Sequence, residues 1–220
     1  MQISYYALTD KGPREENEDA YGIYATYSWL VGVVADGVGG NPGGAVASKL
    51  AVHEVISFFK NLEDPPQDSL DEALIRANAR IRKEQTINPG LSGMATTCTA
   101  IMVKDGRLHI SHAGDSRAYL FRSGDLVRLT QNHSIESTNI LLNALGIRDN
   151  VAIDSKVLNL HSKDTILLCT DGLYKVLHHE LMEKIITESE DSEDIAHRLM
   201  HQAIKTGLID NTTLIVVSVD

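Results

Sequence analysis

The sequence predicts an α+β fold in which mainly antiparallel sheets are flanked by paired helices. Two observations predict this class. Helical patterns occur next to one another along the chain, and strand patterns occur as hairpins with tight turns between them. Parallel βαβ units would instead alternate one strand with one helix. Because 220 residues can form one substantial core, we expect a single domain over residues 1–220.

The first pair of helices is expected at residues 44–60 and from Ser69 onward. Apolar residues recur at helical spacing in residues 44–60. Ser69 and Glu72 have the spacing of a capping box, and the apolar face that follows them reaches Ile81. The two segments therefore read as consecutive amphipathic helices.

Four short strands are expected after these helices, at residues 96–104, 107–114, 116–122 and 125–130. Asp105-Gly106 and Ser123-Gly124 lie where tight hairpin turns would fall, and Asp-Gly is the stronger turn signal of the two. The pattern therefore predicts an antiparallel meander of these strands.

The C-terminal part is expected to contain a further hairpin, two helices and a last strand. These elements are expected at residues 156–160 and 165–170 for the hairpin, 179–187 and 193–206 for the helices, and 212–219 for the strand. Gly207 follows the second helix and is a typical helix terminator.

The composition limits the partners and the location of the protein. A net charge of −10 argues against nucleic acid or an anionic membrane as a partner, because both require basic patches. The first residues, MQISYYALTDKG, lack a signal-peptide pattern, and no apolar stretch approaches the length of a membrane span. We therefore expect a cytoplasmic protein. Cys98 and Cys169 lie inside strand-like runs, so we expect reduced core residues.

Four aspartates stand at the ends of strand-like runs: Asp36, Asp115, Asp171 and Asp210. Carboxylates at strand ends converge at one rim of a sheet, where they would repel each other strongly without a positive charge among them. A hard divalent cation, or a pair of them, is the natural occupant. Glycines follow the first and third of these aspartates, which allows sharp turns there.

Six short motifs strengthen this interpretation because they follow one another in a fixed order. In chain order they are REENED, DGVGG, GMATT, GDSRAY, LLCTDGL and DNTT. Together they resemble the metal-dependent serine/threonine protein phosphatases of the type 2C (PPM) class, and the resemblance covers the chain from end to end. It implies a four-layer αββα sandwich and one PPM-type phosphatase domain.

The resemblance also implies a set of metal ligands. Asp36 matches the aspartate that bridges two Mn²⁺ or Mg²⁺ ions, and the carbonyl of Gly37 joins one of them. Asp171 and Asp210 match the other direct ligands. These are oxygen ligands, which suit hard cations. Asn211 is expected to orient Asp210 or to cap the turn.

The segment REENED is expected to complete the site. On its own, its run of charges would more often be a solvated surface. By resemblance, Glu18 and Asp19 hold an ion directly or through water, and Arg14 binds the phosphate. The planar fork of an arginine suits two phosphate oxygens.

Asp115 has two interpretations. It matches the residue that bacterial members of the class use, together with Asp171, for a third and weaker metal. Alternatively, Asp115 is a turn aspartate that forms a salt bridge with Arg117.

The implied reaction is hydrolysis of phosphoserine and phosphothreonine in proteins by a metal-activated water, without a phosphoenzyme. The implied partners are phosphorylated proteins, as substrates shared with a serine/threonine kinase, and we expect a monomer. Two alternatives come from other classes. One is a phosphoprotein-binding sensor with a degenerate site, and the other is a haloacid-dehalogenase-like phosphatase, which needs a DxDxT motif that DGVGG does not supply.

Departures from the family pattern also carry information. Val38 stands where eukaryotic members have a histidine, which indicates the bacterial branch. Asn132 replaces a common aspartate, and Ala95 a common glycine. SIESTNILLNALG joins two motifs that a flap of some tens of residues usually separates, so we expect substrate access and the role of Asp115 to differ here.

Overall fold

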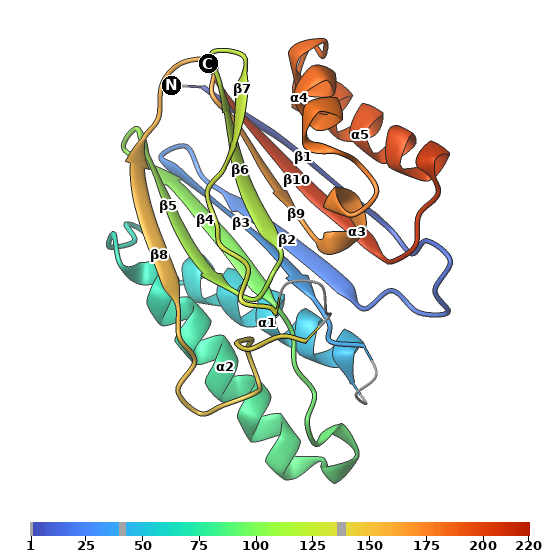
Figure 1. Ribbon diagram of the computed structural model, residues 1–220. Coiled ribbons are helices and arrows are strands. Elements are labelled where there is room, and N and C mark those ends of the chain that lie inside the picture. Colours follow the sequence, from blue (N-terminus) through green and yellow to red (C-terminus); the bar gives the residue numbers. More distant parts are fainter. Residues whose placement is uncertain (1, 40–42, 136–139) are drawn as a thin grey trace.

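The computed structural model describes residues 2–39, 43–135 and 140–220 of the chain (Figure 1). Its strands form two five-stranded sheets, and every pair of neighbouring strands is antiparallel. Sheet A contains, in spatial order, β1 (Ile3–Asp10), β10 (Thr212–Val219), β9 (Thr165–Cys169), β6 (Arg117–Arg122) and β7 (Asp125–Arg128). Sheet B contains, in spatial order, β2 (Asp19–Ala25), β3 (Trp29–Asp36), β4 (Cys98–Lys104), β5 (Arg107–Ala113) and β8 (Asp154–Asn159).

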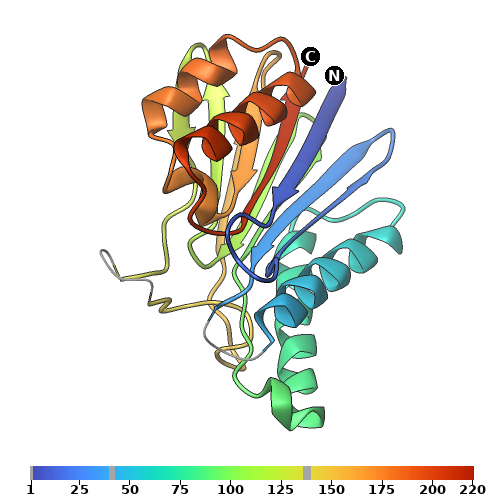
Figure 2. The ribbon, with the colours of Figure 1, turned by 90° about the vertical axis from the view of Figure 1, so that its right-hand side faces the viewer.

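Helices cover the outer face of each sheet, as the two groups on opposite sides of the sheets in Figure 2 show. Sheet B is covered by α1 (Gly44–Lys60) and α2 (Ser69–Ile87), which a short 3₁₀ turn (Pro89–Leu91) follows. On the side of sheet A lie α3 (Asp171–Tyr174), α4 (His179–Thr187) and α5 (Ser192–Thr206). The predicted four-layer αββα sandwich is confirmed. None of the helices in the described ranges has the length and apolar character that a membrane crossing requires.

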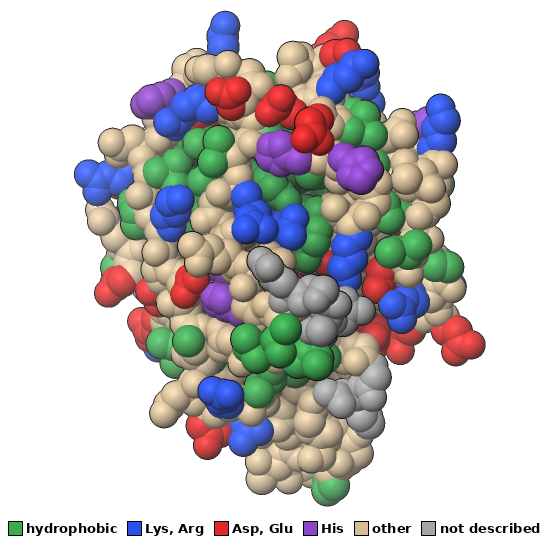
Figure 3. Space-filling view, viewed as in Figure 1, with side chains coloured by type: hydrophobic (Ala, Val, Ile, Leu, Met, Phe, Trp, Pro, Cys, Tyr) green, Lys and Arg blue, Asp and Glu red, His purple; other side chains and the backbone are tan. Residues whose placement is uncertain are grey.

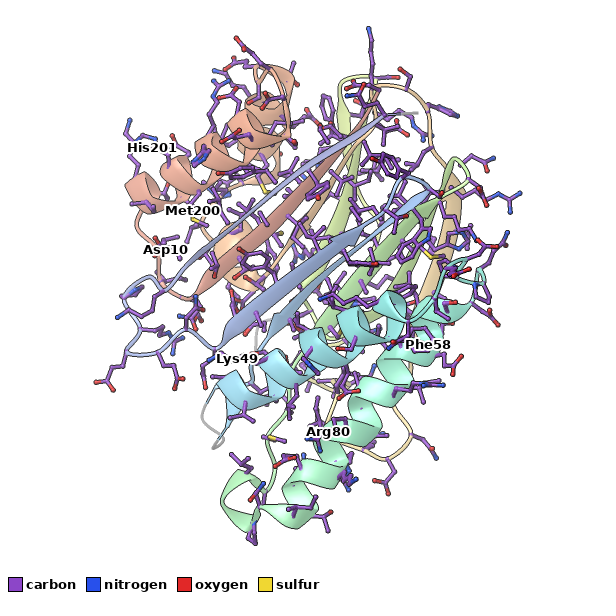
Figure 4. All side chains as sticks on the ribbon, turned by 180° about the vertical axis from the view of Figure 1, so that it is seen from behind. Asp10, Lys49, Phe58, Arg80, Met200 and His201 are labelled. Carbon is purple, nitrogen blue, oxygen red and sulfur yellow. The ribbon has the colours of Figure 1, made fainter. Side chains whose placement is uncertain are left out.

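Three apolar clusters hold the four layers together. Strand β3 shows why they form, because Val31 and Val33 face the helices of sheet B, whereas Leu30 and Val34 face sheet A. A strand that is buried on both faces needs apolar residues throughout, which explains the unbroken run in β3. Seen from behind in Figure 4, Phe58 lies where α1 and α2 meet, and the guanidinium of Arg76 is 4.9 Å from its ring.

The predicted meander is only partly correct. The hairpins at Asp105-Gly106 and Ser123-Gly124 form as expected. However, β5 belongs to sheet B and β6 to sheet A, so these consecutive strands are not paired. The chain changes sheets at Gly114, whose φ of 120° suits glycine. A Cβ on Gly114 would also lie 2.5 Å from Cβ of Thr97.

The predicted hairpin between residues 156–160 and 165–170 is wrong. Strand β8 lies at the edge of sheet B beside β5, and β9 lies in the middle of sheet A. Burial separates the two strands, because most of β8 is exposed while every residue of β9 is buried. An exposed edge strand and a buried central strand pair with different strands. The short segment between β8 and β9 suggested a hairpin and gave no sign of this difference.

The predicted capping box at Ser69 is also wrong. Helix α2 has Asp68 at its N-cap, with no capping side-chain hydrogen bond, and Ser69 is already its first residue. The carboxylate of Glu72 instead accepts a hydrogen bond from Nε of Arg76, at 3.0 Å. Ser69 is buried at the start of the helix, so its side chain does not act as a cap.

The sequence reading missed β1 and β2. Strand β1 pairs along its whole length with β10, from Ile3 opposite Val219 to Asp10 opposite Thr212. Most residues of β1 and β2 are half-buried, so neither shows a clear alternation of polar and apolar residues. The buried free thiols of Cys98 and Cys169 confirm the prediction of reduced core cysteines.

Candidate metal centre and phosphate site

The strand-end acids meet in one pocket of about 240 Å³ at the end of the sandwich. Its described lining consists of Arg14, Glu18, Asp36, Gly37, Val38, Gly39, Thr97, Asp115, Leu141, Asp171, Lys175, Asp210 and Asn211. Every residue that the sequence assigned to the site lines this pocket except Asp19, which is 6% exposed and has Asp36 as its cross-strand partner.

The backbone of Asp36 is fixed by the residues that precede β4. Its N–H donates to Oγ1 of Thr97 at 2.9 Å, and its carbonyl accepts from the N–H of Thr97 and from Oγ1 of Thr96, both at 2.9 Å. Because these bonds satisfy the backbone, they hold the end of β3 in place and leave the carboxylate to face the pocket.

Gly37 is required by close packing. Its N–H donates to the carbonyl of Glu18 at 3.1 Å, and a Cβ on Gly37 would lie 2.5 Å from the carbonyl of Gly44 at the start of α1. A side chain at this position would push α1 away from the site. The glycine therefore keeps Glu18 and the Gly37 carbonyl at the same pocket.

Asp171 and Asp210 stand at the ends of the neighbouring strands β9 and β10. Asp171 is the first residue of α3, and Nζ of Lys175 lies 2.5 Å from its Oδ2. Nη2 of Arg14 lies 2.7 Å from Oδ2 of Asp210. The positively charged side chains of Lys175 and Arg14 thus form ion pairs with two of the carboxylates.

Asn211 ties the segment that carries Arg14 and Glu18 to the start of β10. Its side-chain amide donates to the carbonyls of Lys11 and Glu16, at 2.7 and 3.0 Å, and its Oδ1 accepts from the N–H of Glu18 at 2.8 Å. Its own N–H donates to Oδ1 of Asp210 at 2.9 Å. Asn211 therefore orients Asp210, as expected, and also positions residues that are far away in sequence.

Asp115 lines the pocket without the alternative salt bridge to Arg117. In the described part of the chain, the guanidinium of Arg117 donates to Asn132 and to the hydroxyl of Tyr119, and stacks on the ring of Tyr174. The carboxylate of Asp115 is thus left to the pocket. Burial, followed by the charge of Asp171, raises its pKa, while Lys175 and Arg117 oppose the rise.

The electrostatics of the pocket fit a hard cation. Oδ1 of Asp19 and Oδ1 of Asp171 are buried and have no hydrogen-bond partner among the described residues. Burial, reinforced by Asp171 and Asp210 and opposed by hydrogen bonds from Thr170 and Thr213, raises the pKa of Asp19 to about 7. Burial and four neighbouring carboxylates raise the pKa of Asp36 well above its usual range. Buried carboxylate oxygens without donors are suitable ligands for Mn²⁺ or Mg²⁺.

Within the described ranges, no three Asp, Glu, His or Cys side chains already surround one point as a ligand set. Lys175 and Arg14 each pair with one carboxylate oxygen at this pocket. A bound cation would therefore share the carboxylates of Asp171 and Asp210 with these two side chains.

Two residues that contact the carboxylates of the site were not predicted from the sequence. Lys175 could have been found, because it follows Asp171 at the i, i+4 spacing of helical ion pairs. Thr170, whose hydroxyl donates to Oδ2 of Asp19 at 2.8 Å, carries no local signal. Its partner is 151 residues away in the chain.

The two ends of the short connection that stands in place of a flap are paired with each other. Ser134 pairs with Leu141, and the N–H of Ile135 donates to the carbonyl of Ile140 at 3.0 Å. Residues 136–139 of this connection lie outside the described residues. Leu141 lines the pocket, so the connection forms part of its wall.

The αββα sandwich gathers carboxylates from both sheets into one pocket with an arginine at its rim, an arrangement with the parts that metal-dependent phosphoryl chemistry requires. The chain belongs to the protein phosphatase 2C family, whose model matches residues 13–208. The predicted resemblance to this family is thereby confirmed. A haloacid-dehalogenase-like phosphatase is excluded.

The chain is similar to several bacterial phosphatases, which confirms the predicted branch. It is 33% identical to the serine/threonine protein phosphatase PstP of Mycobacterium tuberculosis over 100% of this chain, but it spans only 45% of that protein's length. It is 30% identical to the serine/threonine phosphatase stp of Listeria monocytogenes over 96% of this chain and 94% of that protein. The catalytic domain of PstP in complex with two manganese ions superposes with a TM-score of 0.87 and 31% identity, covering 99% of each chain.

Proposed function

We propose that this chain hydrolyses phosphoserine and phosphothreonine in proteins, using water activated at a centre of two Mn²⁺ or Mg²⁺ ions. One observation carries the proposal. Carboxylates from both sheets line one pocket, and two buried carboxylate oxygens of Asp19 and Asp171 have no donor among the described residues. The two manganese ions in the similar catalytic domain of PstP support the number and the kind of ion.

Several residues in and next to the pocket would hold the ions. Asp36 would bridge them, with Asp171, Asp210 and the carbonyl of Gly37 as further direct ligands. Glu18 and Asp19 would bind directly or through water, and Asp115 would join Asp171 at a weaker third site. When bound, the ions supply a water of lowered pKa and positive charge for the phosphoryl oxygens.

The phosphate group would be bound by Arg14. Its side chain is 53% exposed at the rim of the pocket, and one of its nitrogens is paired with Asp210. An arginine offers five N–H donors in a planar fork, so donors remain for two phosphoryl oxygens. Arg14 would thus orient the phosphorus toward the carboxylate cluster and neutralise charge on the substrate.

The biological setting that we propose has four parts. Residues 1–220 form a single phosphatase domain, and it acts as a monomer in the cytoplasm. Its substrates are phosphorylated proteins produced by a serine/threonine kinase. The match to the family over residues 13–208 and the similar bacterial phosphatases support the domain and the class of substrate.

The decisive experiment measures hydrolysis of p-nitrophenyl phosphate and of phosphoserine and phosphothreonine peptides with and without Mn²⁺. We expect turnover that a chelator abolishes and that added Mn²⁺ restores. Asp36→Asn should reduce turnover at least about a hundredfold. Asp149→Asn, which removes an exposed carboxylate outside the pocket, is the matched control. Activity that resists the chelator, or that persists in Asp36→Asn, would refute the proposal, and phosphopeptide binding without turnover would favour the sensor alternative.

A further inference from the structure

A second pocket, of about 310 Å³, lies beside the carboxylate pocket. Its described lining consists of Arg117, Tyr119, Arg128, Tyr174, Leu177, His178, His179 and Met182. We call it the cationic pocket. It takes no part in the metal chemistry derived above, and its lining contains two arginines and two histidines but neither aspartate nor glutamate.

The charge of this pocket is opposite to that of the chain as a whole, which has a net charge of −10. Figure 3 shows Lys, Arg and His side chains gathered near the middle of one face, in the region where α3, α4 and β6 lie in Figure 1. A local concentration of positive charge on an acidic protein attracts anions rather than cations. The ligand that fits by charge is therefore acidic.

Arg117 is held in a fixed orientation at this pocket. Its guanidinium carbon lies 3.4 Å from the centre of the Tyr174 ring. Its Nε donates to Oδ1 of Asn132 at 3.2 Å, and its Nη1 donates to the hydroxyl of Tyr119 at 3.1 Å. These bonds occupy two of the five N–H groups of a guanidinium, and the described residues accept none of the others. A guanidinium fixed in this way loses little conformational entropy when it binds an oxyanion.

Arg128 supplies the second charge. It lies on β7 directly opposite Tyr119, is exposed, and forms no side-chain hydrogen bond or ion pair with another described residue. His178, at the N-cap of α4, and His179 complete the basic lining from the opposite side. Leu177 and Met182 are buried and make the floor apolar.

The two pockets are joined by α3. Asp171 and Lys175 line the carboxylate pocket, whereas Tyr174, between them in sequence, lines the cationic pocket. The hydroxyl of Tyr174 donates to the carbonyl of Asp115 at 3.1 Å. A ligand in the cationic pocket would therefore lie on the same face as a phosphoryl group at the metal centre.

We infer that the cationic pocket binds a second acidic group of the phosphoprotein substrate, a carboxylate or another phosphate, while the phosphoserine or phosphothreonine occupies the carboxylate pocket. The inference rests on the proposed function and adds a substrate class to it. Substrates with an acidic residue near the phosphorylated one in space would be preferred. The two arginines favour oxyanions, because a planar guanidinium matches the geometry of carboxylate and phosphate.

The test uses the full chain with Mn²⁺ and a series of phosphoserine peptides that differ at one position. That position carries glutamate, a second phosphoserine or alanine, two to six residues to either side of the phosphoserine. We expect kcat/KM for the best acidic peptide to exceed that for its alanine counterpart at least about fivefold. Arg128→Ala should bring this ratio close to one, and Arg128→Lys should keep part of it. Arg107→Ala, which removes an exposed arginine outside the pocket, should leave the ratio unchanged.

Three results would overturn the inference. One is an absence of any preference for acidic peptides in the unaltered chain. Another is the same preference in Arg128→Ala and Arg128→Glu as in the unaltered chain. The third is a change in inhibition by inorganic phosphate in these variants without a change in peptide preference, which would assign the pocket to free phosphate. Failure of the unaltered chain to hydrolyse p-nitrophenyl phosphate would instead refute the proposed function itself.

Discussion

Nζ of Lys175 lies 2.5 Å from Oδ2 of Asp171, four residues earlier in the chain. Burial on its own would lower the pKa of Lys175, but the hydrogen bond to Asp171 and the charges of Asp171 and Asp115 outweigh it and raise the pKa. The lysine therefore stays charged and balances carboxylates of the proposed metal centre. The ammonium group of Lys175 and a metal ion would therefore share the carboxylate of Asp171.

Replacing Lys175 should strengthen metal binding. In Lys175→Met, the dissociation constant for Mn²⁺ should fall about fivefold, because an ammonium group no longer neutralises the carboxylate of Asp171. Calorimetric titration of the metal-free protein measures this constant. Lys184→Met on α4 removes the same charge at an exposed position and is the control. Weaker Mn²⁺ binding in Lys175→Met than in the control would show that the lysine assists the metal instead.

The metal-free protein should lose stability as the pH rises. Aspartates in an unfolded chain release their protons near pH 4, whereas Asp19 in the folded protein retains its proton to a pKa of about 7. Between these values the folded state binds more protons than the unfolded state, so the free energy of unfolding falls with increasing pH. Urea unfolding with chelator at pH 5 and pH 8 measures the change.

Two comparisons isolate the contribution of Asp19. Asp19→Asn, which cannot ionise at this position, should reduce the change in the free energy of unfolding between pH 5 and pH 8 by a few kcal/mol. In the unaltered chain, saturating Mn²⁺ should reverse the sign of that change, because protons compete with the metal for the carboxylates. An unaltered metal-free chain that is equally stable at both pH values would contradict the raised pKa of Asp19.

Arg14 should act on the substrate more than on the metal. Arg14→Ala should raise KM for a phosphopeptide about tenfold, because a charge-assisted bidentate contact is lost. The affinity for Mn²⁺ should stay the same or increase, since Asp210 loses a competing partner. Arg14→Lys keeps the charge but not the planar fork. Its KM should therefore lie between that of the unaltered chain and that of Arg14→Ala. A loss of Mn²⁺ affinity in step with KM would assign Arg14 to the metal site alone.

Loss of the Asn211 side chain should loosen the segment that carries Arg14 and Glu18. Asn211→Ala removes three partly buried hydrogen bonds to backbone groups and should lower the free energy of unfolding by about 3 kcal/mol. Asn61→Ala removes one bond, to the exposed carbonyl of Ser57, and should cost less than about 1 kcal/mol. Urea unfolding with chelator measures both, and equal effects would argue against a special role for Asn211.

The sequence predicted the structure correctly where that structure depends on residues that are close together in the chain. The hairpin at Asp105-Gly106 needs only a turn that tolerates positive φ, and both residues have it. Asp36, Asp115, Asp171 and Asp210 end or precede strands of both sheets, so the argument from strand ends brought all of them to one pocket. The family resemblance added the layering, which local patterns do not contain.

The sequence did not predict strand pairing where packing between the two sheets decides which strands pair. The short turn after β5 predicts pairing with β6, yet Arg117 at the start of β6 pairs with Cys169 instead. Likewise, no pattern near Glu18 indicates that Asn211, 193 residues later, holds its backbone. Such contacts depend on the whole sandwich and on close approaches such as that of Gly114 to Thr97.

The pairing of β1 with β10 joins segments about 200 residues apart, and Asn211 repeats that link at the pocket. Contacts of such large sequence separation form late, because the intervening chain must be ordered first. Glu18 and Asp19 can therefore meet Asp210 only after β10 has docked. A growing polypeptide would have no complete ligand set, so metal uptake, and with it phosphatase activity, would begin only once the sandwich has closed. Metal binding would then occur only in molecules that have completed folding.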